Sequence, residues 1–188
     1  MEKEIRNIQN LITRSKEDSR LVEGYAIVFN SESQDMGYIE TISPTAIDED
    51  VIKRSDIFAY LNHDVNRGVL ARSRYGVGSL KLSLENDGLY YSFEAPKTQL
   101  GDELLSYLER GEITTSSFAF TVAEDGDRWW RDENGTLRRE IRKIDRLFDV
   151  SPVFEAAYVA TACAKRKLDE IQANEERLDN LKKEIENL

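Results

Sequence analysis

The only histidine of this 188-residue chain, His63, stands at the polar end of the apolar run at residues 57–61. An imidazole gains and loses a proton near neutral pH, and it is therefore a common general base in enzymes. A single imidazole also excludes any metal site that is built on two or three histidines. His63 is the first candidate for catalysis, and a structural histidine with satisfied hydrogen bonds is an equally weighted alternative.

A nucleophile needs a hydroxyl or a thiol beside a base. Residues 114–117 are Thr-Thr-Ser-Ser, and they directly precede the alternating aromatic segment Phe-Ala-Phe at 118–120. This cluster is able to present a serine beside His63, although serines and threonines are also common in strands without catalytic roles. The only cysteine, Cys163, lies among small residues, where a buried, inert thiol is the favoured interpretation. The residues alone leave the nucleophile open.

Two acidic residues are candidates for the group that orients an imidazole. Asp145 and Asp149 precede Val-Ser-Pro-Val at residues 150–153. A buried aspartate beside a histidine holds the ring in one tautomer. Several basic residues lie in the same segment, so each aspartate is equally well explained as a surface ion-pair partner. Composition does not choose between these roles.

The charge balance excludes several classes of function. The chain has 26 Lys and Arg against 36 Asp and Glu, and its formal net charge of −10 disfavours nonspecific binding to nucleic acid or anionic membranes. No D-x-D-x-D-G calcium loop occurs, so neither a metal nor another cofactor is expected. No apolar run approaches the roughly 18 residues of a membrane span, and the N-terminus has no apolar signal region. We expect a soluble intracellular protein.

The middle of the chain has the patterns of β-strands. Residues 21–29 are rich in β-formers. Leucines alternate with polar residues at 80–84, and Asn-Asp-Gly at 86–88 joins them to residues 89–93, which predicts a β-hairpin. Further strands are expected at 113–123, 128–131 and 137–147. Leucines with helical spacing at 100–108, closed by Gly111 in a C-cap position, predict one helix within this β-rich part. The predicted fold class is mainly β with helices (α+β).

The last segment has a different pattern. Ala164, Ile171, Leu178 and Ile185 recur every seven residues among charged side chains, while Asn174 interrupts a second stripe. A weak coiled coil or a helix that docks on a partner is one interpretation, and a terminal helix with a mostly solvated face is the other. The predicted parts are an N-terminal arm, mobile or a short helix, at 1–20, a β-rich domain at 21–163 and a helical tail at 164–188.

Several short blocks occur in sequence along the chain. They are Gly-Tyr-Ala-Ile-Val-Phe-Asn at 24–30, Asn-His-Asp at 62–64 with Val-Leu-Ala-Arg at 69–72, Gly111 with Ser-Phe-Ala-Phe at 117–120, and Asp-Val-Ser-Pro-Val at 149–153 with Ala-Tyr at 157–158. In this order the blocks resemble those of the prohead protease family of tailed phages. They span about residues 21–161, and their order makes the signal specific although each block is short. Because that family is similar in fold to the herpesvirus assemblins, the resemblance implies an assemblin-like β-barrel flanked by helices.

The resemblance carries roles onto four positions. The catalytic histidine of the family falls on His63, and its serine, which directly precedes the Phe-small-Phe strand, falls on Ser117 and not on Ser116. The acidic third member falls on Asp149, where many relatives carry Glu. A basic position upstream falls on Arg139 and implies support for the oxyanion, as an arginine gives in assemblins.

The resemblance implies a serine endopeptidase of phage capsid maturation. Its expected substrates are the major capsid protein or the scaffolding protein, and the protease itself. The enzyme is expected to act as a homo-oligomer inside the procapsid, in the infected or lysogenic bacterial host, and to need no cofactor, nucleic acid or membrane. The alternative is a catalytically silent scaffold whose β-domain binds capsid protein while residues 164–188 oligomerise.

Overall fold

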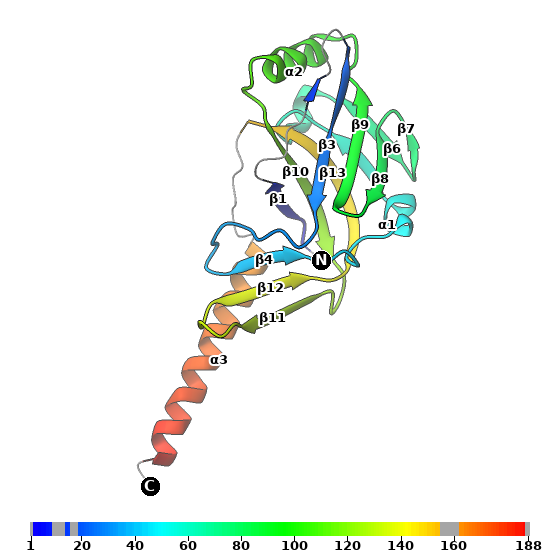
Figure 1. The fold of residues 1–188 in the computed structure, drawn as a ribbon. Helices are drawn as coiled ribbons and strands as arrows, with labels where there is room; N and C mark the ends of the chain where they lie inside the picture. Colours follow the sequence, from blue (N-terminus) through cyan, green and yellow to red (C-terminus); the bar gives the residue numbers. More distant parts are fainter. Residues whose placement is uncertain (1, 9–13, 16–18, 155–161, 187–188) are drawn as a thin grey trace. The chain divides into compact units, whose positions relative to one another are not determined.

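The computed structural model describes residues 2–8, 14–15, 19–154 and 162–186. The chain divides into two compact units, residues 1–158 and 159–188. The described strands all belong to the first unit and form three sheets (Figure 1). This unit is a mixed α+β structure that consists mostly of sheet, as the sequence patterns predict.

The largest sheet carries the strands that matter most for the site. Its six strands follow the order β1 (Glu4–Ile8), β10 (Thr115–Val122), β13 (Ile144–Val153), β5 (Asp56–Ala59), β6 (Ala71–Arg74) and β7 (Val77–Gly78). β10 lies between β1 and β13 and is antiparallel to both. Both edges of β10 are therefore paired, which fits its nearly continuous burial.

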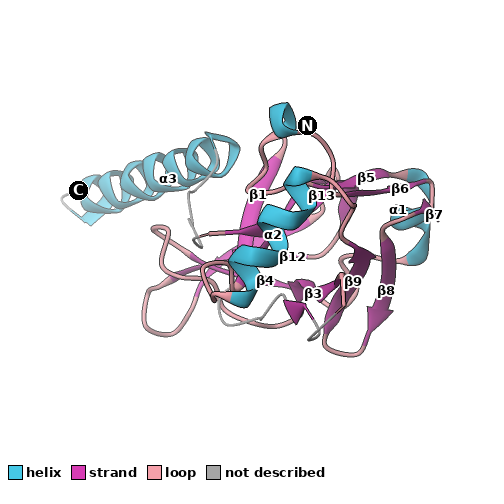
Figure 2. Ribbon diagram, turned by 90° about the horizontal axis from the view of Figure 1, so that it is seen from above, coloured by secondary structure: helices cyan, strands magenta, loops and turns pink. Residues whose placement is uncertain are grey.

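Two smaller sheets complete the unit. One has the order β2 (Arg14–Ser15), β3 (Leu21–Val28), β9 (Gly88–Glu94) and β8 (Lys81–Glu85), and the other has the order β11 (Asp127–Arg131), β12 (Leu137–Ile141) and β4 (Ile39–Ile42). The described strands thus form open sheets and no closed barrel, which corrects the expected assemblin-like β-barrel. In Figure 2 the strands β5, β6 and β13 lie apart from β3, β8 and β9, as separate layers.

The segment expected as one strand at 137–147 is two strands in different sheets. The backbone amides of Arg142 and Lys143 both donate to the carbonyl of Gly126, at 2.7 and 2.9 Å. This connection ends β12 at Ile141 and starts β13 at Ile144, both of which are buried. β12 pairs in parallel with β4 and belongs to the three-stranded sheet, whereas β13 belongs to the six-stranded sheet. One continuous strand was expected here.

The predicted hairpin is confirmed as β8 and β9. Glu85 pairs with Gly88 and Leu84 with Leu89 across a two-residue turn. Gly88 is required there because a Cβ atom would lie 1.9 Å from the carbonyl oxygen of Ile27 on β3. The close approach of the neighbouring strand therefore selects glycine at this position.

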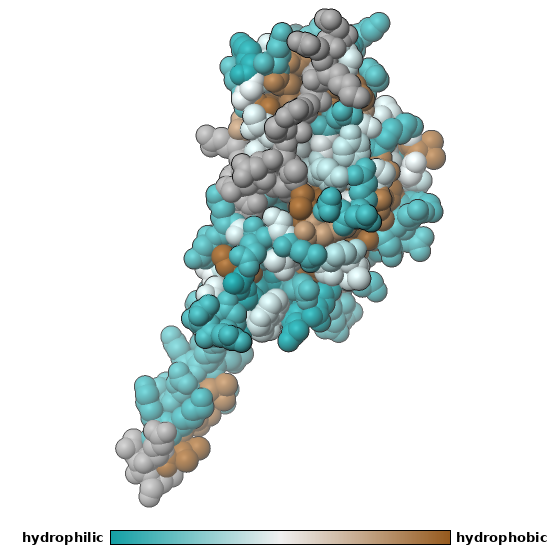
Figure 3. All heavy atoms as spheres, in the orientation of Figure 1, coloured by the Kyte–Doolittle hydropathy of each residue, from teal (hydrophilic) through white to brown (hydrophobic). Residues whose placement is uncertain are grey.

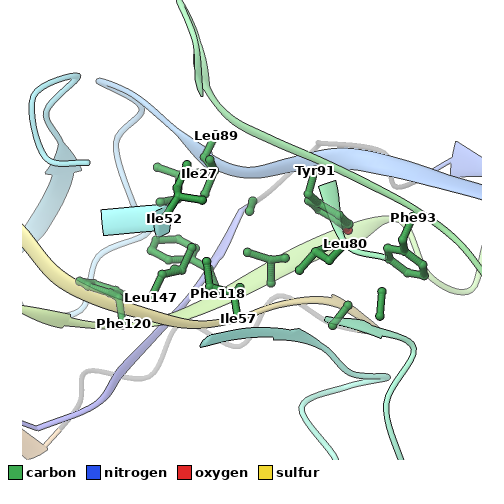
Figure 4. Close-up of a cluster of buried hydrophobic side chains, with 14 of the residues drawn as sticks. Ile27, Ile52, Ile57, Leu80, Leu89, Tyr91, Phe93, Phe118, Phe120 and Leu147 are labelled. Atoms are coloured by element: carbon green, nitrogen blue, oxygen red, sulfur yellow. The ribbon is translucent and has the colours of Figure 1, made fainter. Parts of the chain in front are cut away.

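The hydrophobic core lies between the six-stranded and four-stranded sheets. Phe118, Phe120 and Leu147 come from the larger sheet and are almost completely buried. Ile27, Leu89 and Tyr91 come from the smaller sheet and lie opposite them (Figure 4). Inward residues from both sheets interdigitate in such packing, and the core thereby holds β10 in a defined register.

The helices are α1 (Glu49–Arg54), α2 (Gln99–Glu109), α3 (Ala162–Glu186) and the short 3-10 helix η1 (Val65–Arg67). The prediction of α2 is confirmed, with the Thr98 hydroxyl accepting from the Gly101 amide at its start. Gly111 follows with a φ of 69°, a left-handed conformation that suits glycine after a helix.

Helix α3 forms the second unit and is mostly polar. Two of its apolar residues, Leu178 and Ile185, are 57% and 70% exposed. Figure 3 shows apolar residues along this helix among hydrophilic neighbours. Within the described residues, no helix combines the length and the apolar character needed to cross a membrane.

Candidate active site

Three separate segments bring Ser117, His63 and Asp149 together. Ser117 lies on β10, Asp149 lies on β13, and His63 lies in the loop that follows β5. Ser117 pairs with Ser151 and Ala119 pairs with Asp149 across the two antiparallel strands. Directly opposite residues project to one face, so Ser117 and Asp149 lie on the same side of the sheet.

The three side chains are connected through the imidazole ring. His63 Nε2 lies 2.6 Å from Ser117 Oγ, and His63 Nδ1 lies 2.6 Å from Asp149 Oδ1. The second pair is within ion-pair distance, although its angle departs from that of a straight hydrogen bond. An ionised carboxylate only accepts hydrogen bonds, so a neutral ring in this arrangement would carry its proton on Nδ1 and leave Nε2 as an acceptor for the serine.

The loop that carries His63 has an unusual backbone. Asn62 and His63 have φ angles of 55° and 59°, a left-handed conformation that is uncommon for residues other than glycine. The Asn62 amide donates to the carbonyl of Pro152 at 2.9 Å, which ties the loop to the end of β13. Backbone conformations of this kind persist where the surrounding contacts enforce them, and they occur often at functional sites.

Asp149 is buried, and three groups contact its carboxylate. Lys3 Nζ lies 3.1 Å from Oδ2, Ser151 Oγ donates to Oδ1 at 2.9 Å, and His63 meets the same Oδ1. Burial raises the pKa of Asp149, but the contact with His63 and the charges of His63 and Lys3, together with the Ser151 hydrogen bond, hold this pKa below its usual value. Asp149 therefore stays ionised at neutral pH.

The neighbouring alternatives do not reach the imidazole. Ser116 is buried on the opposite face of β10, where its Oγ lies 2.8 Å from the hydroxyl of Tyr91. Asp145 is partly exposed, and its Oδ2 lies 4.0 Å from Arg146 Nε. Ser116 and Ser117 therefore project to opposite faces of β10, and only Ser117 contacts the imidazole.

Arg139 is not brought together with the other three predicted residues. Its guanidinium is buried against the carboxylates of Glu4, Glu40 and Asp127, and each of its three nitrogens donates to at least one of them. Arg6 joins the same cluster through Glu4 and Glu40. We call these five residues the ion-pair network. The network engages the donors that were expected to support an oxyanion.

The N-terminal arm contributes a strand where a mobile arm or a short helix was expected. β1 pairs with the free edge of β10, with Arg6 opposite Phe118 and Asn7 opposite Ser117. The carbonyl oxygen of Arg6 lies 3.0 Å from Ser117 Oγ and is a second possible acceptor for its single hydroxyl proton. Pairing with the edge of β10 satisfies the backbone hydrogen-bonding groups of this charged segment. This contact joins distant parts of the chain, so local composition does not predict it.

Sequence reasoning assigned no role to Lys3 or Ser151, yet both contact Asp149. Ser151 had a usable signal, because residues two apart in a strand share a face and Asp149 is two positions upstream. Lys3 had none, since 146 positions separate it from Asp149. Residues 157–158 and the Cys163 side chain lie outside the part of the chain that the structure describes. Within the described part, no three His, Cys, Asp or Glu side chains form a cluster that could hold a metal ion.

Comparisons with known proteins identify the family of this chain. The family model described as caudovirus prohead serine protease matches residues 9–174. The structure of the capsid assembly protease gp21 of bacteriophage T4 has a TM-score of 0.51 at 10% identity, over 81% of this chain and 98% of that chain. That likeness shows a common fold. A comparison with curated proteins finds no significant match. Because the family model covers most of its length, the chain belongs to the caudovirus prohead serine protease family.

Proposed function

We propose that this protein is a serine endopeptidase that cleaves scaffolding or major capsid protein, and itself, inside the procapsid of the bacterial host. Ser117 is the nucleophile, His63 is the general base and acid, and Asp149 orients the ring. The observation that carries this proposal is the pair of 2.6 Å contacts that the single imidazole makes with Ser117 and Asp149. Nucleophile, base and orienting group in this order are what acyl transfer by a serine requires.

The proposed reaction has two halves. Ser117 Oγ attacks the scissile carbonyl carbon while His63 Nε2 takes its proton, and the tetrahedral intermediate collapses as His63 returns that proton to the leaving amine. Water then attacks the acyl-enzyme, again with His63 as base, and releases the carboxylate product. The ionised Asp149 stabilises the imidazolium that forms in both halves.

The contacts of Ser117 bear on how the reaction starts. Its single hydroxyl proton has two acceptors, Nε2 at 2.6 Å and the Arg6 carbonyl at 3.0 Å. The shorter contact favours the imidazole, which is the productive direction. With the guanidinium of Arg139 engaged by carboxylates, we assign the oxyanion to backbone N–H groups near Ser117.

The test is direct labelling and cleavage. The purified full chain should react with a fluorophosphonate probe and should shorten the capsid or scaffolding protein of the same phage, while Ser117→Ala should do neither. A folded wild-type chain that binds capsid protein but neither reacts with the probe nor cleaves would favour the silent scaffold instead.

We further propose that residues 164–188 serve association. The seven-residue spacing of Ala164, Ile171, Leu178 and Ile185 forms an apolar stripe, and its exposed residues Leu178 and Ile185 need a partner helix or a docking groove to cover them. A chain that ends at Lys165 should keep peptidase activity on an unstructured peptide and lose self-association or recruitment to capsid protein. A folded but inactive shortened chain would show instead that the tail completes the active site.

A further inference from the structure

Ser151 is a buried hydroxyl that the proposed mechanism does not use. It lies on β13, two residues after Asp149, and pairs directly with Ser117 on β10. All three side chains therefore project to the same face of the sheet. A buried hydroxyl at this position needs hydrogen-bond partners, and the identity of those partners indicates its role.

The Ser151 hydroxyl bridges the carboxylate and the histidine loop. Its Oγ donates at 2.9 Å to Asp149 Oδ1, the same oxygen that lies 2.6 Å from His63 Nδ1. It also accepts from the Tyr60 amide at 3.3 Å, at the start of the loop that carries His63. A hydroxyl has one donor hydrogen and two lone pairs, so both bonds exist together.

The bridge acts on both partners of the Nδ1 contact. The donated bond restricts rotation of the Asp149 carboxylate, which has only one other described contact besides His63, the half-exposed Lys3. The accepted bond ties the loop to β13 next to the bond from the Asn62 amide to the Pro152 carbonyl. The left-handed residues Asn62 and His63 come two and three positions after Tyr60, and their conformation places the ring.

We propose that Ser151 is a positioning residue of the peptidase, whose hydroxyl holds the Asp149 carboxylate and the His63 loop in the relative arrangement that orients the imidazole. The inference rests on the proposed function and adds a fourth side chain to it. A purely structural serine would only satisfy the Tyr60 amide. The two roles differ in what their loss changes: positioning alters turnover, whereas structural support alters stability.

The kinetic test compares two buried serines. Ser151→Ala should lower kcat by about 10- to 100-fold, the effect of losing a hydrogen bond to a charged group, and change KM less than about threefold because the hydroxyl does not reach substrate. Ser116→Ala is the matched control, since it removes a buried hydroxyl from the opposite face, where the partner is Tyr91. It should leave kcat within about threefold.

Two further variants keep the test decisive. In an Asp149→Asn background, Ser151→Ala should lower kcat by less than about threefold, because the two residues act through one contact. Ser151→Thr retains the hydroxyl and should recover most of the turnover in its folded fraction, as measured by circular dichroism. A folded Ser151→Ala protein with wild-type kcat, or losses that multiply fully in the double variant, would overturn the proposal.

A readout without peptidase activity separates this inference from the proposed function. His63 is the only histidine, so its two ring nitrogens give unambiguous nitrogen NMR signals. We expect a protonated Nδ1 in the wild type at neutral pH and a mixture of tautomers in Ser151→Ala, with no change in Ser116→Ala. An unchanged tautomer would refute the role of Ser151 even if the enzyme is active. If the wild-type chain is inactive but Ser151→Ala still changes the tautomer, the proposed function is refuted and the positioning role of Ser151 is retained.

Discussion

Two clusters of buried charge lie among the described residues close to β1, and this segment takes part in both. On one face of β1, Glu4 and Arg6 belong to the ion-pair network with Arg139. Just before the strand, Lys3 contacts Asp149, and the backbone carbonyl of Arg6 lies 3.0 Å from Ser117 Oγ. A five-residue edge strand thus connects a group of paired charges with a group arranged for chemistry.

The two clusters differ in how completely their charges are paired. In the ion-pair network, burial raises the pKa of Glu4, but hydrogen bonds and charge from Arg139 and Arg6 hold it below its usual value. Each carboxylate of the network contacts at least one guanidinium. The other cluster contains an imidazole whose side chain is 20% exposed, next to a hydroxyl. Buried charge alone therefore does not indicate catalysis, whereas an accessible base beside a nucleophile does.

The largest expected effect separates the two faces of β10. Ser117→Ala should lower turnover by on the order of 10⁴-fold or more, because it removes the nucleophile, while Ser116→Ala should keep most activity. Single-turnover assays on one peptide measure both. Equal losses in the two variants, or the reverse order, would contradict the assignment.

The next effect tests the acidic member of the candidate triad. Asp149→Asn keeps the side-chain volume but allows the wrong tautomer of His63, so turnover should fall by on the order of 10²–10⁴-fold. Asp145→Asn, a change in a partly exposed residue on the same strand, should have little effect. If neither variant loses activity, His63 is oriented by another group.

A change in the ion-pair network should have the opposite signature. Arg139→Met leaves Glu4 and Glu40 with one guanidinium fewer, so we expect the free energy of unfolding to fall by about 3–5 kcal/mol. Turnover of the folded fraction should stay within about threefold of wild type. Urea unfolding and kinetics on the same samples measure the two quantities. A stable Arg139→Met protein with strongly reduced kcat would restore the oxyanion role.

The smallest effect concerns Lys3, which is 46% exposed and contacts the buried Asp149. The folded-state pKa of Asp149 is lowered, so its contribution to stability is complete above the unfolded value of about 3.9 and is lost as the pH falls through the folded value. Lys3→Ala should therefore lower stability by about 0.2–1 kcal/mol at neutral pH. The difference from wild type should vanish in acid.

Urea unfolding of Lys3→Ala across this acid range provides the measurement. Lys3→Arg keeps the positive charge and should match the wild type throughout. A loss for Lys3→Ala that is equal at every pH would mean that Lys3 stabilises β1 by packing and not through the charge of Asp149.

Local patterns predicted much of the scaffold. The β8–β9 hairpin follows from alternation and its turn residues, and α2 follows from helical spacing with Gly111 after its end. These features depend on residues close together in the chain. The expectation of one strand at 137–147 failed because a hydrogen-bonded connection to Gly126, more than fifteen residues upstream, ends β12 at Ile141.

The sequence by itself determined which residue types were available: one imidazole, a serine before an alternating aromatic strand, and an aspartate before Val-Ser-Pro-Val. Only the tertiary structure decided that Arg139 belongs to the ion-pair network and that Lys3 and Ser151 contact Asp149. The physical reason is that side-chain partners depend on strand register and burial, which arise from contacts between distant segments. β1 and β10 are about 110 residues apart in the chain, and their pairing sets which side chain faces which cluster.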